Sequence, residues 1–428
     1  MIKNFWNRLF LEERPSISLG LFRIAAALTT AFHVIPSLLH LPDNYFSTAF
    51  KTYNPSFFTI EELQLVQKSP DWLVVVFVWI FCVSCFSFLI GFLSQLSCIV
   101  MTLACYYFYA LNALHVGTLS WDILLVTLFL MCITGYHGDY FSVDCVRKRD
   151  EQSYKKQRPF FVQRLLQLQI GFTFFYTALY KVTAQGNWLT HNPIYSLMNY
   201  PTTGVVKTFI LKDFLYDQPQ LCFAIGVLIV TLELLMIFLL FYHRTRIAAI
   251  YLGCFFHVLL ILTLDVPATF FFLFPPQLLL FVNPRRLIKW IEGKRNYHAA
   301  SRQCQLLYDG KCQFCLNSVK QLKVMDLFGE LKYVDFQSHL DQLEKLHPDL
   351  TKQAALSQLH LIDTDGSLTG GFDALKRLSL KLPMLWPFIF PFYFPGASFV
   401  GKIMYRWVAN HRYLFHRGPV CTDHSCFK

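Results

Sequence analysis

The segment YDGKCQFC carries two cysteines, Cys312 and Cys315, separated by two residues. An apolar run before it predicts a strand over 305–310, and the amphipathic pattern after it predicts a helix to about Phe328. A cysteine at a helix N-terminus is stabilised as a thiolate by the helix dipole and by backbone N–H groups that have no helical partner. We therefore expect Cys312 to attack a disulfide and Cys315 to resolve the mixed disulfide.

The cysteine pair also has two alternative explanations, half of a structural zinc site and simple burial. The segment CTDHSC could supply further zinc ligands, although its Cys-x2-His-x-Cys spacing is unusual; these are Cys421, His424 and Cys426. Seven other cysteines fall inside long apolar runs and are expected to serve as small buried hydrophobes: Cys82, Cys85, Cys98, Cys105, Cys132, Cys222 and Cys254. Of these explanations we favour redox chemistry, and we expect no metal.

The composition indicates an integral membrane protein. The chain has 428 residues, of which 54% are hydrophobic and 15% charged, with 44 phenylalanines. Its mean hydropathy is +0.39, which is too apolar for an ordinary soluble enzyme. The net charge of +11 does not indicate a nucleic-acid partner, because the Lys and Arg residues cluster between apolar runs.

Eight apolar segments approach the length of about 20 residues that a helix needs to cross a hydrocarbon core of about 30 Å. They are 17–38, 72–92, 95–114, 119–135, 162–183, 220–242, 246–263 and 266–282. The last contains Pro275 and Pro276, so it could be kinked or re-entrant. The sequence thus predicts a membrane bundle of about eight helices over 1–298, followed by an α/β thioredoxin-like domain over 302–428.

The distribution of basic residues predicts the orientation. They concentrate near the N-terminus and in the segments 147–158, 244–246 and 285–295, whereas the remaining loops hold only Lys51, Lys68, Lys207 and Lys212. Cytoplasmic loops are enriched in Lys and Arg. We therefore expect a multi-pass protein of a bacterial inner membrane, with the N-terminus, the C-terminus and the cysteine pair all on the cytoplasmic side.

Ionisable residues inside membrane spans are rare and usually have a partner or face a cavity. Arg23 in the first span and Glu233 in the sixth lie at similar depth, which predicts a buried ion pair between them. His257 lies near mid-membrane, where a hydrogen bond within the core is one explanation and a site role is the other.

A second group of polar residues gathers near the outer ends of the spans. It includes His33, Lys181 and Trp188, together with His115, Asp122, His191 and Asp265. Such a group could form an active site that opens to the outer face. The alternative is that the lysine extends to the lipid headgroups and that each histidine is merely tolerated at the interface.

Three segments of the membrane part resemble a known family. These are FYTALYKVTAQGNWLTHNPIY (175–195), SLGLFRIAAAL with Arg23, and FFHVLLILTL with His257. They are similar to the HTTM family, which includes the vitamin K-dependent gamma-carboxylase, over roughly residues 10–290. The resemblance implies that Lys181 is a base acting toward a quinone or another lipophilic substrate, and a partly desolvated lysine is a usable base. Protein carboxylation is not implied, because the large lumenal domain of the carboxylase has no counterpart here.

The tail resembles a second family through YDGxCxFC, DTDG, GGFDAL and YRWVANHRYLFHR. These motifs are similar to the DCC family of thiol-disulfide oxidoreductases along nearly the whole tail. The resemblance implies a thiol substrate, with Asp309 and Gly310 supporting the cysteines. A cytoplasmic location would favour a reductase supplied by a cytoplasmic thiol donor. The alternative function is a transporter or ligand-binding membrane protein whose tail senses redox state.

Overall fold

The computed structural model describes residues 6–39, 60–111, 119–148, 156–183, 187–199, 214–263, 274–301, 303–339 and 350–411. The chain forms two compact units. The membrane unit comprises Met1–Tyr140 and Gln157–Pro284, and the tail unit comprises Phe141–Lys156 and Arg285–Lys428. The tail unit includes the helix that precedes residue 302, and this helix bonds to the tail: Arg295 donates to the carbonyl oxygen of Asp326 at 3.0 Å.

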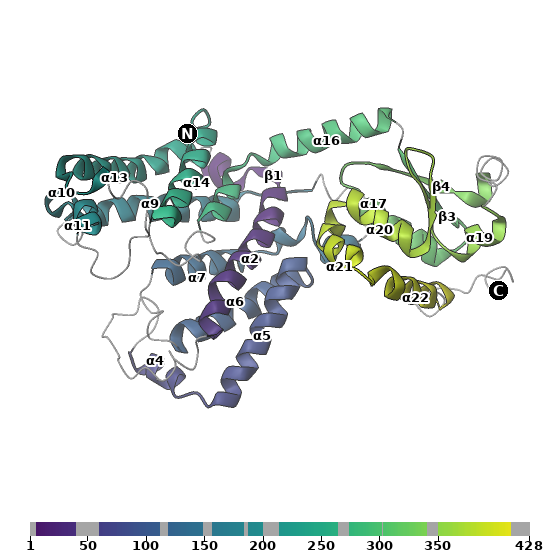
Figure 1. Cartoon of the computed structure of the whole chain (residues 1–428), viewed down its shortest axis with the longest axis horizontal. Helices are drawn as coiled ribbons and strands as arrows, with labels where there is room; N and C mark the ends of the chain where they lie inside the picture. Colours follow the sequence, from purple (N-terminus) through teal and green to yellow (C-terminus); the bar gives the residue numbers. More distant parts are fainter. Residues whose placement is uncertain are drawn as a thin grey trace. The chain divides into compact units, whose positions relative to one another are not determined.

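In the described part of the membrane unit, four helices are long and apolar enough to cross a membrane: α2 (Ile17–Leu39), α5 (Asp71–Ile90), α6 (Ser94–Leu111) and α13 (Pro219–Phe241). Two shorter apolar helices are α7 (Leu119–Met131) and α14 (Arg246–Thr263). Figure 1 shows α2, α5 and α6 running beside one another. Helices long enough to span a membrane are therefore present at four of the predicted positions, shorter apolar helices lie within two more, and the number eight stays a prediction.

Helix α9 (Phe161–Val182) is long, but its first half carries four polar side chains, Gln163, Arg164, Gln167 and Gln169. The side-chain amides of Gln163 and Gln167 both donate to the carbonyl oxygen of Leu280, at 2.6 and 2.7 Å. Leu280 belongs to η4 (Pro275–Phe281), a short 3-10 helix in the segment predicted as the eighth span. The described residues of the segment 266–282 therefore do not form a regular α-helix. Residues 264–273 lie outside the described part of the chain. The glutamines satisfy a carbonyl that this irregular backbone exposes.

The remaining elements of the membrane unit are short. They are η1 (Asn7–Leu11), β1 (Glu13–Pro15), α4 (Ile60–Gln67), η2 (Tyr136–Gly138), β2 (Gln157–Pro159), α10 (Trp188–His191) and α11 (Pro193–Asn199). Strands β1 and β2 pair antiparallel.

The tail unit has a small mixed sheet (Figure 1). Its strands are β3 (Cys304–Tyr308), β4 (Leu331–Asp335), β5 (His360–Ile362) and β6 (Leu368–Gly370), in the order β4-β3-β5-β6. Strands β3 and β4 are parallel, and the other two pairs are antiparallel. The helices are α8 (Val143–Lys148), α16 (Pro284–Ala300), α17 (Gln313–Met325), α19 (Lys352–Ser357), α20 (Gly371–Lys381), η5 (Pro383–Phe388), α21 (Ile389–Tyr393) and α22 (Ala397–Asn410).

Alternation along β3 builds a core on each face of this sheet, since successive side chains of a strand point to opposite faces. Leu306 packs in a cluster with Leu361 and Leu378, whereas Leu307 packs in a separate cluster with Val334 and Phe336. The strand and the helix predicted around Cys312 are both present, as β3 and α17. Helix α17 ends at Met325 rather than Phe328, at the point where the side chain of the next residue, an aspartate, accepts two backbone N–H groups from the start of β4.

Candidate functional site

Cys312 is the N-cap residue of α17, directly after β3 and its loop. Its Sγ accepts a hydrogen bond from the backbone N–H of Cys315 at 3.4 Å, and its own N–H donates to the carbonyl oxygen of Asp309 at 3.2 Å. Cys312 is buried and Cys315 is half-buried. A negative charge on the Cys312 sulfur would be stabilised by the positive end of the helix dipole. It would also be stabilised by a backbone N–H group that has no hydrogen-bond partner within the helix.

The loop that presents Cys312 is fixed by two carboxylates. Asp309 accepts the backbone N–H of Lys311 at 3.0 Å and the side-chain amide of Gln337 at 3.1 Å. Asp335 accepts the N–H of Gly310 at 3.0 Å. Both carboxylates accept backbone N–H groups of the loop, so they hold it in shape.

Gly310 has a steric reason to be glycine. A Cβ at this position would overlap the carboxylate of Asp335. The close approach is what lets the Gly310 N–H reach that carboxylate. Asp335 itself was missed by the sequence analysis, although a signal existed: it pairs with Tyr308 at the carboxyl ends of the parallel strands β3 and β4, which meet at one edge of a sheet.

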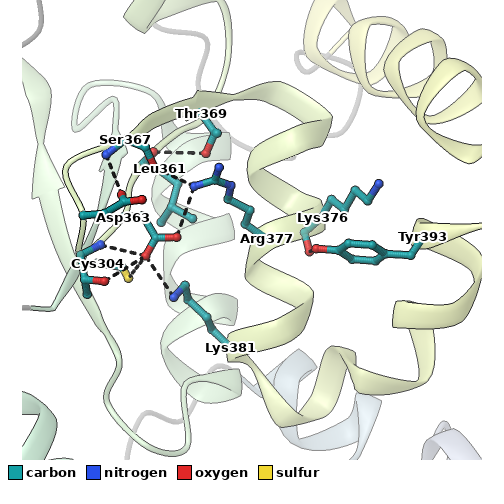
Figure 2. Close-up of polar contacts among 11 residues, drawn as sticks. Cys304, Leu361, Asp363, Ser367, Thr369, Lys376, Arg377, Lys381 and Tyr393 are labelled. Carbon is teal, nitrogen blue, oxygen red and sulfur yellow. Dashed lines mark hydrogen bonds and ion pairs between the residues drawn. The ribbon is translucent and has the colours of Figure 1, made fainter.

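The DTDG motif forms a separate polar cluster around Asp363 (Figure 2). Its carboxylate accepts a hydrogen bond from the Cys304 thiol at 3.1 Å, and it forms ion pairs with Lys381 at 3.2 Å and Arg377 at 3.3 Å. Arg377 also donates to the hydroxyl of Ser367 at 2.8 Å. These contacts join β3, the turn after β5 and α20, so this motif stabilises the sheet and its covering helix.

The Cys304 thiol differs from the Cys312–Cys315 pair in its electrostatic environment. Burial, followed by the hydrogen bond to Asp363, raises the pKa of the Cys304 thiol. Burial alone would raise the pKa of the Asp363 carboxyl, but hydrogen bonds from Cys304, the Thr364 N–H and Lys381 lower it to about 2. Cys304 therefore stays protonated at neutral pH and is a poor nucleophile.

In the membrane unit, three of the predicted site residues come together. Lys181 lies near the end of α9, and its Nζ is 2.5 Å from each carboxylate oxygen of Glu233 on α13. The same nitrogen lies 5.2 Å from the ring centre of Trp188. Lys181 and Glu233 are largely buried, at 18% and 8% side-chain exposure. These contacts bring an amine, a carboxylate and an indole together, and all three side chains were predicted as site residues of the membrane unit.

The predicted ion pair between Arg23 and Glu233 is wrong. Glu233 is paired with Lys181, while Arg23 is fully buried and donates to the carbonyl oxygens of His137 and Tyr140 at 2.9 and 3.2 Å. Equal depth on two helices does not show that the side chains face each other. Arg23 instead satisfies backbone carbonyls at the short helix η2.

Of the four histidines named as candidates, His33 and His257 make contacts of their own, and His115 lies outside the described residues. His33 is buried with its ring 5.0 Å from that of Trp121. His257 is stacked on Phe274 at 4.6 Å, and its Nδ1 lies 2.8 Å from the carbonyl oxygen of Gly253 one turn earlier in α14. The hydrogen bond to Gly253 favours the first of the two explanations for His257, a hydrogen bond within the core, over a role in a site.

Comparison with known proteins assigns both units. Residues 12–285 match the HTTM domain. The chain belongs to the HTTM family. In this HTTM protein, residues 306–417 match the DCC1-like thiol-disulfide oxidoreductase domain. Both families predicted from the sequence are thereby confirmed, in the predicted order along the chain.

The HTTM protein is similar over part of its length to a protein of Arabidopsis thaliana that is described as an uncharacterised chloroplastic protein. The two are 30% identical over 83 residues, which is 19% of this chain and 38% of the relative. The HTTM protein thus aligns with well under half of that relative. No solved structure matches.

Metal ligands do not gather in the described part of this HTTM protein: there, no three residues of the types His, Cys, Asp or Glu are grouped to hold a metal ion. The residues weighed as zinc ligands, Cys421, His424 and Cys426, lie outside the described residues. Redox chemistry at Cys312 and Cys315 therefore rests on the helix-capping geometry and on the DCC1-like match.

Proposed function

We propose that this protein is a membrane-bound thiol-disulfide oxidoreductase whose tail has a thioredoxin-like fold and whose membrane unit handles a quinone or another lipophilic substrate. The observation that supports the redox activity best is Cys312 at the N-cap of α17, with its sulfur accepting the N–H of Cys315. A thiolate is the attacking form of cysteine, and this position stabilises negative charge.

The reaction takes two electrons from the cysteine pair. The Cys312 thiolate attacks one sulfur of a substrate disulfide, and the other substrate sulfur leaves as a thiolate that takes up a proton. Cys315, after losing its proton, then attacks Cys312, and the second substrate sulfur leaves. The protein ends with a Cys312–Cys315 disulfide and the substrate with two thiols. A cytoplasmic thiol donor would return the pair to the reduced state.

The membrane unit would use Lys181 as its base. Glu233 lies within hydrogen-bonding distance of the same nitrogen, so it can take the lysine proton and leave a neutral amine. Trp188 supplies an aromatic face beside that amine, which suits a flat lipophilic substrate. We place the protein in a bacterial inner membrane with both termini in the cytoplasm, on the distribution of Lys and Arg in the sequence.

A second candidate is a transporter or ligand-binding protein with a redox-sensing tail. The observation that favours it is the Lys181–Glu233 pair itself, because paired charges within spans mark substrate and ion pathways as well as enzyme sites. Substitution separates the two functions. If Lys181→Ala abolishes quinone-dependent turnover, the enzyme is favoured; if turnover persists and ligand uptake is lost, the transporter is favoured.

The redox activity is tested with the full chain in detergent micelles and insulin as a disulfide substrate. Cys312→Ser should abolish insulin reduction driven by dithiothreitol above the uncatalysed rate. Cys82→Ser is the matched control, because Cys82 lies on α5 in the other unit and should leave the rate unchanged. Equal rates for Cys312→Ser and the unchanged protein would reject the oxidoreductase.

A further inference from the structure

A cavity of about 480 Å³ lies in the tail unit, and Cys315 forms part of its wall. The residues that follow Cys315 along α17 line it at helical spacing, including Ser318 and Leu322. Residues from α20 and α22 close the opposite side, among them Leu375 and Met404. Its volume lies within the range of roughly 300–1,000 Å³ that small-molecule sites occupy.

Specific contacts hold α22 as a wall of this cavity. Gly401 lies so close to the ring of Phe372 that a Cβ there would overlap it. The hydroxyl of Tyr405 accepts the backbone N–H of Leu359 at 2.9 Å, which ties α22 to the start of β5. Figure 2 shows Lys376 of α20 against Tyr393 of α21, with the ammonium 4.2 Å from the ring centre, so the preceding helix is anchored as well.

The lining indicates a neutral and mostly apolar ligand. Among the described residues of the lining, Asp309 is the one charged side chain, and its Oδ1 already accepts two hydrogen bonds, from Lys311 and Gln337. These described residues include no Lys or Arg, so they offer no countercharge to a fatty acid or another anionic amphiphile. A few hydrogen-bonding side chains, such as Ser318, can bind a carbonyl group while apolar residues enclose a ring.

The outer face of α22 suits a lipid surface. Phe399, Ile403 and Trp407 are each more than half exposed and recur every four residues, so they form one stripe on the helix. Arg406 adds a positive charge to the same helix, and so does Lys402, which forms an ion pair with Asp373 at 2.8 Å. Exposed aromatic and aliphatic residues with adjoining cations are the composition of a helix that lies in a membrane interface. A ligand of this cavity can therefore come from the lipid phase.

We propose that this cavity admits a neutral, lipophilic two-electron acceptor of the quinone class from the membrane, and that Cys312 and Cys315 reduce it directly. Two S–H bonds break and one S–S bond forms; the two electrons and two protons released convert the quinone to a hydroquinone. Cys315 is the sulfur that faces the ligand. The proposal rests on the redox activity proposed above and adds the class of its second substrate.

The test uses the full chain in lipid nanodiscs, reduced and freed of reductant, with a short-tailed ubiquinone as the probe. Quinone loss is followed by absorbance, and the Cys312–Cys315 disulfide is quantified by mass spectrometry. Ser318→Phe should fill the cavity beside Cys315 and slow quinone reduction by about tenfold or more. Lys320→Phe is the matched control, because it adds the same ring to an exposed position of α17 outside the lining.

Insulin reduction distinguishes this proposal from the proposed function. We expect Ser318→Phe to slow quinone reduction much more than insulin reduction, since the water-soluble disulfide need not enter the cavity. Met404→Glu, which adds a charge at an exposed part of the wall, should show the same difference between the two substrates. The proposal is overturned if both variants reduce quinone as fast as Lys320→Phe, or if the protein reduces insulin but never the quinone.

Discussion

Lys181 lies within 2.5 Å of both carboxylate oxygens of Glu233, across two neighbouring helices of the membrane unit. Because removing one partner of a buried ion pair leaves the other charge uncompensated, Glu233→Gln should destabilise the protein by about 3 kcal/mol. Lys181→Met should lower the free energy of unfolding by a similar amount. The double variant should lose less free energy of unfolding than the sum of the two single variants. Thermal unfolding in detergent measures this coupling.

Arg23 supplies the control for that cycle. Its side chain donates to carbonyl oxygens at η2 rather than to Glu233, so the effects of Arg23→Met and Glu233→Gln should add within about 0.5 kcal/mol. Strong coupling between Arg23 and Glu233, with none between Lys181 and Glu233, would contradict the pairing described here.

Gly310 tests how the redox loop is held. In Gly310→Ala the new methyl group meets the Asp335 carboxylate, so the loop must shift and the tail should lose about 1–3 kcal/mol, with slower disulfide reduction. Gly293→Ala is the matched control: it lies in α16 with nothing near its Cβ, and a helical alanine is more stable than glycine by about 0.5–1 kcal/mol. Unfolding in denaturant and insulin reduction are measured for both.

The Asp363 cluster predicts an acid transition of the tail. Its carboxyl pKa is about 2 in the folded protein, against roughly 3.9 for an unfolded chain. A lowered folded pKa means that the stabilisation is complete above about pH 4 and is lost as the pH falls toward 2. The tail should therefore unfold more readily over that interval, and Asp363→Asn should flatten the dependence. Unfolding followed by circular dichroism at stepped pH checks this, and an unchanged slope in the variant would contradict it.

Cys304 and Cys315 should differ in reactivity toward iodoacetamide. The Cys304 thiol is buried, its pKa is raised, and it donates to Asp363, whereas Cys315 lies in a cavity wall. At pH 7.5, a condition chosen below the ordinary thiol pKa of about 8.5, Cys315 should be alkylated well before Cys304. Peptide mass spectrometry after timed quenching gives both rates, and faster labelling of Cys304 would refute this assignment.

Local sequence signals predicted the tail well, since YDGKCQFC specifies a strand, a turn and a helix start within a few residues. The same signals could not find Asp335, because its contact with Gly310 depends on how two strands pair. In the membrane unit, apolar length predicted the positions of the four long helices α2, α5, α6 and α13, but rotation of each helix about its axis decides which side chains meet. Depth alone therefore predicted Arg23 with Glu233, whereas packing of α9 against α13 brings Lys181 to that carboxylate.

The central claim is that Cys312 attacks a disulfide and Cys315 resolves it, and trapping the intermediate tests it most directly. Full-length Cys315→Ser is incubated with oxidised insulin, and the adducts are digested and mapped by mass spectrometry. The account predicts an insulin chain linked through a disulfide to Cys312, absent when Cys312→Ser is added. No adduct at Cys312, or an equal yield without Cys312, would contradict it.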